Sequence, residues 1–149
     1  MKKLFVIANW MQGTGLSGGD RIFIELIKKW QFKLDITLLI SQEGSVICQY
    51  HKLSNIRQNI WASDRLVKLG YLIDTLYRTS VSIKEAFSIK MLSGDIVFSS
   101  SDFWPDFFPA FILKLKNPKI IWVAGFYLFA PKPWDKFSPY RSKNFLIGL

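Results

Sequence analysis

The first thirty residues join a short apolar run, a glycine-bearing loop and an amphipathic segment, and this order restricts the fold. Residues 3–8 (KLFVIA) are almost continuously apolar, which predicts a strand buried on both faces. Residues 16–30 (LSGGDRIFIELIKKW) predict a helix, because apolar residues recur there at helical spacing. That apolar stripe comprises Ile22, Phe23, Leu26, Ile27 and Trp30.

Two adjacent glycines, Gly18 and Gly19, precede this helix, and they fit an anion site. The first N–H groups of a helix have no partner within the helix, and the helix dipole favours negative charge at that end. Glycine also allows a phosphate to approach the backbone without meeting a Cβ. Ser17 and Asp20 fit a variant capping box. The alternative is that the glycines only form a tight turn.

The rest of the chain alternates further apolar runs with helical segments. Strands are expected at residues 34–40, 95–99 and 119–124, with weaker candidates at 46–50 and 56–61. Helices are expected in three segments. Residues 82–92 follow a Ser82–Glu85 capping box, and a helix around Phe107–Leu115 is either kinked at Pro109 or begins near Asp106. Residues 64–77 place five apolar residues on one side of a helix, namely Leu66, Leu69, Ile73, Leu76 and Tyr77. This alternation predicts an α/β domain with a mostly parallel sheet flanked by helices, and a length of 149 residues fits one domain.

Ligands of such sheets bind beyond the carboxyl ends of the strands. Three predicted loops lie there, at residues 9–19, 99–104 and 124–128, and polar and glycine residues concentrate in them. Gly13, Gly15 and Gly18 also match the spacing of a dinucleotide-binding fingerprint. However, four residues separate the strand from Gly13, and no acidic residue ends the second strand, so a dinucleotide site is not expected.

The motif SGGD, the helix pattern xxxxELxKxW after it, and the later order DIVFSSSDFWP, helix, KIIWVAG resemble the N-terminal domain of family-four glycosyltransferases of the GT-B fold. The resemblance covers essentially all of residues 1–149. It implies a Rossmann-like domain that forms one half of a GT-B fold and binds mainly the acceptor. It also implies a nucleotide-sugar donor as substrate, with no cofactor and no metal ion.

The resemblance further implies a C-terminal donor-binding domain, for which residues 126–149 are the expected start of the connection. The chain alone is then expected to be inactive. Many family members carry His-Gly after the last strand, whereas this chain has Ala124-Gly125. The residues expected to bind the donor phosphate or substrate are Ser17, Gly18, Gly19 and Asp20. The residues expected to bind the acceptor are Trp10, Ser100, Ser101, Asp102, Gly125 and Tyr127.

Asp102 is the candidate catalytic residue, because it lies in a loop at the expected cleft and could orient a hydroxyl or accept its proton. The alternative is that Asp102 caps the following helix. The single histidine, His51, offers no partner for a metal site or a triad, and Cys48 is expected to be a buried apolar residue.

A net charge of +9 indicates an anionic partner. With the aromatic segments around residues 104–116 and 126–143, this charge leaves two alternatives to the enzyme hypothesis: a stand-alone phosphate- or nucleotide-binding module, and a basic protein that binds membrane surfaces. Nucleic-acid binding is not expected, because the basic residues are scattered. Neither a signal peptide nor a transmembrane helix is expected, so the predicted location is the cytoplasm, with peripheral contact at the membrane.

Overall fold

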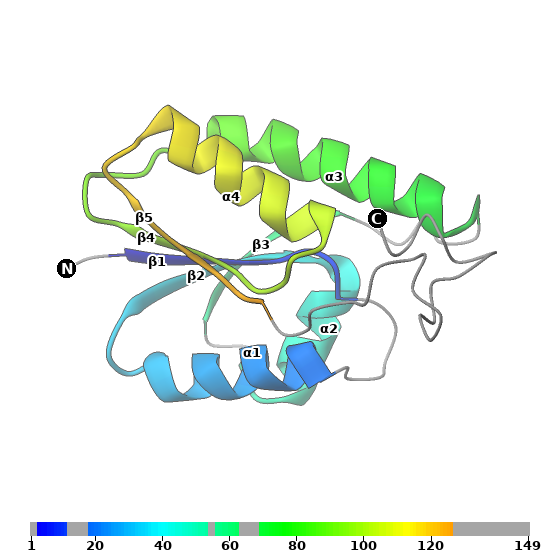
Figure 1. The fold of residues 1–149 in the computed structure, drawn as a ribbon. Helices are drawn as coiled ribbons and strands as arrows, with labels where there is room; N and C mark the ends of the chain where they lie inside the picture. The colour runs from blue at the N-terminus through cyan, green and yellow to red at the C-terminus, as the bar shows by residue number, and fades with distance from the viewer. Residues whose placement is uncertain (1–2, 12–17, 54–55, 63–68, 127–149) are drawn as a thin grey trace, which may run out of the picture.

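A five-stranded parallel sheet lies between two layers of helices in the computed structural model, which describes residues 3–11, 18–53, 56–62 and 69–126 (Figure 1). The strands are β1 (Lys3–Ala8), β2 (Asp35–Ser41), β3 (Arg57–Ala62), β4 (Ile96–Ser99) and β5 (Ile121–Ala124). Their order in the sheet is β3-β2-β1-β4-β5, and each neighbouring pair is parallel. The predicted α/β, Rossmann-like fold is therefore confirmed.

Two helices cover each face of this sheet. The helices α1 (Gly18–Trp30) and α2 (Gln42–Tyr50) lie on one face, below the sheet in Figure 1. The helices α3 (Tyr71–Ser88) and α4 (Trp104–Lys116) lie side by side on the other face. A helix follows each of β1, β2, β3 and β4 along the chain. Because all five strands are parallel, their carboxyl ends lie at one edge of the sheet.

Alternate residues of β1 belong to two separate apolar cores. Leu4 and Val6 belong to the core that contains Phe23 and Ile27 of α1, whereas Ile7 belongs to the core that contains Leu113 of α4. All six of these side chains are at most 2% exposed. A strand with apolar residues at both sets of alternating positions requires cover on both faces, and the two helical layers supply that cover.

The segment that follows β2 was predicted wrongly. Residues 46–50 were expected to form a short strand, but they belong to α2, which begins at Gln42 directly after β2. Ser41 explains this start, because its side-chain oxygen accepts a hydrogen bond from the Gly44 N–H and caps the helix. The weaker strand candidate at residues 56–61 corresponds to β3.

The helix predicted at residues 82–92 was also wrong as a separate element. The chain forms one helix, α3, from Tyr71 to Ser88, and Ser82 lies buried inside it. The Ser82 hydroxyl donates to the Arg78 carbonyl oxygen within the helix, at 2.6 Å, and does not cap a new helix. Residues 64–68 of the helix predicted at 64–77 lie outside the described residues. Next along the chain, α4 begins at Trp104 and contains Pro109 in its interior.

The polarity of α3 is reversed relative to the usual amphipathic helix of a soluble protein. Its buried residues are Asp74, Thr75, Arg78, Thr79, Ser82 and Ala86. The apolar residues Leu69, Ile73 and Leu76, predicted to share one side, are all exposed to solvent. Polar groups thus face inward along this helix.

Candidate functional site

The candidate site lies at the carboxyl edge of the sheet, between β1 and β4. The chain leaves β1 toward β2 and β3, and later returns to β4 on the other side of β1. The loops after β1 and β4 therefore run in opposite directions, and this is the position at which open parallel sheets bind ligands. Residues 9–11 and 100–103 form the described part of these two loops.

Asp106, in the first turn of α4, holds the two loops together. Its Oδ1 accepts hydrogen bonds from the backbone N–H groups of Asn9, at 2.6 Å, and Trp10, at 3.1 Å. Its Oδ2 accepts from the hydroxyls of Ser100, at 3.1 Å, and Ser101, at 2.5 Å. The Asp106 carboxyl thus fixes the start of the loop after β1 against the loop after β4.

Burial raises the pKa of the Asp106 carboxyl to about 7 from an ordinary value of 3.8. Asp106 is only 1% exposed, and the loss of water disfavours its charged form. The four hydrogen bonds act in the opposite direction and lower the pKa, but burial is the larger effect. Near neutral pH this group therefore gains or loses a proton.

Arg78 joins the two helical layers around the same edge of the sheet. It projects from α3, is fully buried, and its Nε lies 2.9 Å from Asp74 Oδ2. Its terminal nitrogens reach Glu43 Oε2 of α2, at 2.5 Å, and the carbonyl oxygens of Asn9 and Met11, at 3.1 Å and 3.4 Å. Two carboxylates and two carbonyl oxygens thus compensate the buried charge and hold the loop after β1.

Asn9 lies between these two groups and is fully buried. Its side-chain amide donates hydrogen bonds to Ser82 Oγ and, at 3.5 Å, to the Arg78 carbonyl oxygen. Its Oδ1 accepts no hydrogen bond from the part of the chain that the structure describes. Buried side-chain oxygens normally have a donor, so Asn9 is an unusual acceptor beneath the loop after β1.

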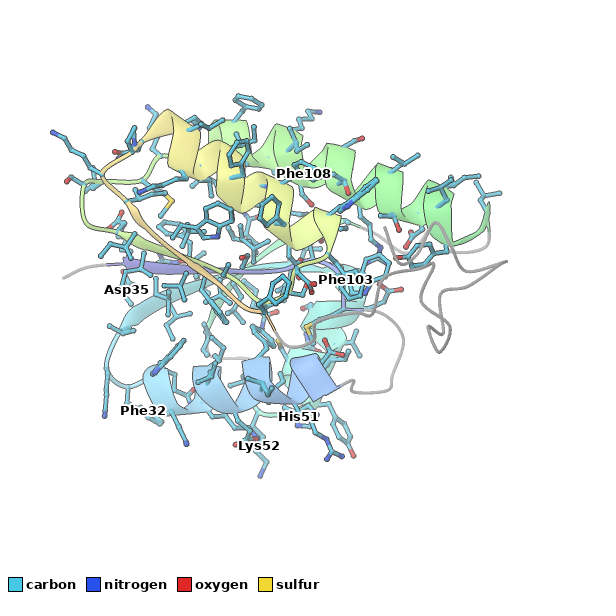
Figure 2. All side chains as sticks on the ribbon, viewed as in Figure 1. Phe32, Asp35, His51, Lys52, Phe103 and Phe108 are labelled. Carbon is cyan, nitrogen blue, oxygen red and sulfur yellow. The ribbon has the colours of Figure 1, made fainter. Side chains whose placement is uncertain are left out.

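An aromatic cluster lies over the same loops. The Trp10 ring stacks on Phe103, with ring centroids 4.7 Å apart, and meets the edge of the Tyr71 ring at 5.4 Å. Figure 2 shows Phe103 at the end of the sheet where the chain enters α4. The three rings come from the loop after β1, from α3 and from the loop after β4, and they form one rim of the candidate site.

Gly18 and Gly19 open α1, the helix that follows the loop after β1. A Cβ atom added at Gly18 would meet no other atom within 4 Å, so the space beside its backbone is open. Gly18 is exposed and Gly19 is half-buried. The start of α1 can therefore receive a ligand close to its backbone N–H groups.

The structure brings together several of the residues predicted to form the site. Ser100 and Ser101 contact Asp106, Trp10 contacts Phe103, and the Gly125 N–H donates to the Ser99 carbonyl oxygen at 2.7 Å. Asp20 lies half-buried in the first turn of α1. Ser17 and Tyr127 lie outside the described residues.

Asp102 is exposed in the loop after β4. The alternative that it caps the next helix is wrong, because Phe103 occupies the N-cap position of α4. Asp102 therefore lies one residue before the N-cap of α4, with its side chain exposed.

Asp106 and Arg78 were not predicted from the sequence to be parts of the candidate site. The available signal for Arg78 was its spacing of four residues from Asp74, which places opposite charges on one side of a helix. Asp106 follows Trp104-Pro105 in the first turn of a helix, where acidic residues are common whether or not they have a further role. Its hydrogen bonds connect residues almost a hundred positions apart, so sequence spacing could not reveal them.

Among the residues that the structure describes, no group of three His, Cys, Asp or Glu side chains could hold a metal ion. Within the same residues, no helix has the length and apolar character needed to cross a membrane. Comparison of the chain with protein-family models, with curated proteins and with solved structures finds no match.

Proposed function

We propose that this chain is the acceptor-binding N-terminal domain of a glycosyltransferase that uses a nucleotide-sugar donor. The main support is the glycine pair Gly18–Gly19, which opens α1 next to open space and follows the loop after β1. The parallel sheet order supports the same proposal, because it places the loops after β1 and β4 around one site.

In this proposal the start of α1 binds the diphosphate of the donor. Its backbone N–H groups and the helix dipole stabilise negative charge, which grows on the leaving diphosphate as the sugar is transferred. Glycine at position 18 lets the phosphate approach closely. Asp20 and Ser17 belong to the same proposed phosphate-binding segment.

The acceptor is proposed to bind against Trp10, Ser101, Asp102 and Gly125. Asp102 orients the acceptor hydroxyl or accepts its proton, since it is the exposed carboxylate of the loop after β4. Asp106 has a different role: its carboxyl is saturated with hydrogen bonds from the loops, so it positions the loops and does not contact substrate.

A second, donor-binding domain is part of this proposal. A helix start without a cationic side chain fixed against the phosphate supplies only a small part of the binding energy, so the chain alone should bind the donor weakly and transfer little sugar. The proposed partners are a nucleotide sugar, a sugar or lipid-linked acceptor, and the donor-binding domain. The proposed location is the cytoplasm, at the membrane surface.

The test begins with the coding sequence downstream of codon 149 and in the neighbouring genes. The proposal expects a second Rossmann-like domain with two spaced glutamates, and sugar transfer from a radiolabelled nucleotide sugar only when both parts are present. Asp102→Asn in the complete enzyme should lower kcat by roughly 100-fold or more, the usual contribution of an acid–base group. The half-buried Asp35, at the amino edge of the sheet, supplies the control variant Asp35→Asn.

Two results would contradict the proposal. One is the absence of any such second domain from the locus. The other is saturable binding of a free nucleotide by residues 1–149 in calorimetry at micromolar concentration, which would instead identify a stand-alone nucleotide-binding module.

A further inference from the structure

The outer surface of α3 carries four exposed apolar side chains, with the exposed Ser80 and Lys84 between the last two of them. Leu72, Ile73 and Leu76 are 51%, 48% and 49% exposed, and Phe87, near the end of the helix, is 59% exposed. These positions recur at helical spacing and share the side of α3 that faces away from the sheet. The inward side holds Asp74, Arg78 and Ser82, so the exposed side is the more apolar one.

The outer surface of α4 also carries exposed apolar side chains. Phe111 and Leu115, four residues apart on one side of the helix, are 38% and 60% exposed. Because α3 and α4 pack side by side above the sheet, their outward sides belong to one surface of the molecule (Figure 1). We call this surface the α3/α4 face and define it by Leu72, Ile73, Leu76, Phe87, Phe111 and Leu115.

Exposed charges around the α3/α4 face are mainly positive. In the described span 71–120, the exposed charged residues are Lys84, Lys90, Lys116, Lys119 and Asp102. Lys116 lies within 5.9 Å of the Phe87 ring centroid, and its ammonium donates to the carbonyl oxygens that end α3. Lys116 thus lies beside Phe87 at the carboxyl-terminal end of the exposed apolar residues of α3.

We propose that the α3/α4 face binds the surface of an anionic lipid bilayer. Apolar side chains along a helix enter the boundary between headgroups and acyl chains, while neighbouring lysines contact anionic headgroups. A second copy of the chain fits less well, because it also carries a net charge of +9 and offers these lysines no excess of negative charge. This inference does not depend on the glycosyltransferase proposal.

The opposite helical layer supplies the control. Ile22 of α1 and Val46 of α2 are 44% and 53% exposed, and they lie on the other face of the sheet. Phe32, His51 and Lys52 also lie on that side (Figure 2). The double variant Leu72→Gln/Leu76→Gln alters the proposed face, and Ile22→Gln/Val46→Gln removes similar exposed apolar surface elsewhere.

Flotation with phosphatidylcholine vesicles containing 30% phosphatidylglycerol tests the proposal. The whole chain should float with these vesicles and bind pure phosphatidylcholine several-fold less. Leu72→Gln/Leu76→Gln should lower the bound fraction at limiting lipid by roughly tenfold, since two leucines lose their transfer into the interface. Ile22→Gln/Val46→Gln should bind like the wild type. Circular dichroism should show all three proteins equally folded, because the substituted side chains are exposed.

A fluorescent label gives a second measurement that does not depend on loss of binding. Ser80 lies on the exposed side of α3, and burial raises the pKa of the Cys48 thiol to about 12, so an introduced cysteine reacts selectively. An environment-sensitive dye on Ser80→Cys should shift to the blue with anionic vesicles, and the same dye on Val46→Cys should not.

Any of three outcomes would overturn the proposal: a wild-type chain that does not float, equal loss of binding in the two double variants, or a blue shift at Val46→Cys alone. A dimer that Leu72→Gln/Leu76→Gln converts to a monomer, together with no vesicle binding, would assign the face to a second copy.

Discussion

At the scale of single residues, the conformation of Gly18 shows whether the fold or ligand binding requires glycine at this position. Its φ is not in the left-handed region, and a Cβ at this position meets open space. The fold therefore does not require glycine here. Close approach of a ligand to the backbone remains as a reason for it.

Gly18→Ala should leave the melting temperature unchanged or raise it, because alanine is the better helix former. The same change should weaken binding of inorganic pyrophosphate by roughly tenfold, since the added methyl group lies where the phosphate approaches. NMR titration of the amides of residues 18–20 measures this binding. Gln42→Ala, at the start of α2, is the control for a general effect at helix starts. Equal pyrophosphate binding by wild type and Gly18→Ala would contradict the phosphate role.

Asp106 gives a residue-scale prediction about pH. Its pKa is raised to about 7 in the folded chain from 3.8, so the folded state holds a proton that the unfolded state releases between these values. Its contribution to stability is therefore fully present below about pH 4 and is lost as the pH rises through about 7. The slope is at most about 1.4 kcal/mol per pH unit.

Urea unfolding at several pH values between 4 and 8 measures this contribution, and Asp106→Asn should remove it. The asparagine oxygen can still accept from the Asn9 and Trp10 N–H groups, and its amide can donate to the serine hydroxyls. The difference between the two stability curves isolates Asp106 from other titrating groups. Parallel curves for wild type and Asp106→Asn would show that the carboxyl does not titrate in this range.

At the scale of secondary-structure elements, α3 connects the two helical layers through Arg78. Its guanidinium contacts Asp74 in α3, Glu43 in α2 and the loop after β1. The polar side of the helix is therefore buried because it contains the partners of this network. As a consequence, Leu72 and Leu76 of α3 are exposed to solvent, on the proposed membrane face.

Arg78→Met should lower the free energy of unfolding by about 3–5 kcal/mol, because two buried or half-buried carboxylates lose their cation. Arg78→Lys should be intermediate, since a single ammonium cannot reach all four acceptors. Chemical denaturation measures both changes. Lys84→Met, on the exposed side of the same helix, should change stability by less than about 0.5 kcal/mol. A loss below about 1 kcal/mol for Arg78→Met would mean that the network adds little to the fold.

At the scale of the whole molecule, the net charge of +9 is the main electrostatic feature. Positive charges repel one another in the compact state, and salt screens exposed charges more than buried pairs. Raising sodium chloride from 20 to 500 mM should therefore stabilise the fold by about 1 kcal/mol, or roughly 3 °C in melting temperature. Differential scanning calorimetry checks this prediction. A melting temperature that falls with salt would mean that exposed ion pairs outweigh the repulsion.

The sequence by itself determined the fold class, and it predicted the edge of the sheet at which the candidate site lies. Residues 3–8, 35–40 and 96–99 are apolar at both sets of alternating positions, and only a sheet covered on both faces buries such strands. Because the strands were predicted to be parallel, the loops after β1 and β4, which contain Trp10, Ser100 and Ser101, were expected at the same edge of the sheet. These features are local, so they can be read from neighbouring residues.

Only the tertiary structure decided which side of α3 faces inward, and which groups connect the loops of the site. Periodicity identifies two sides of a helix, and apolar burial usually selects the inner one. In α3 the inner side is instead the one that contains Arg78, because the guanidinium there contacts residues 9, 11, 43 and 74. Asp106 likewise contacts residues far away in the chain. Such networks form only after folding brings distant residues together, and no local pattern in the sequence records them.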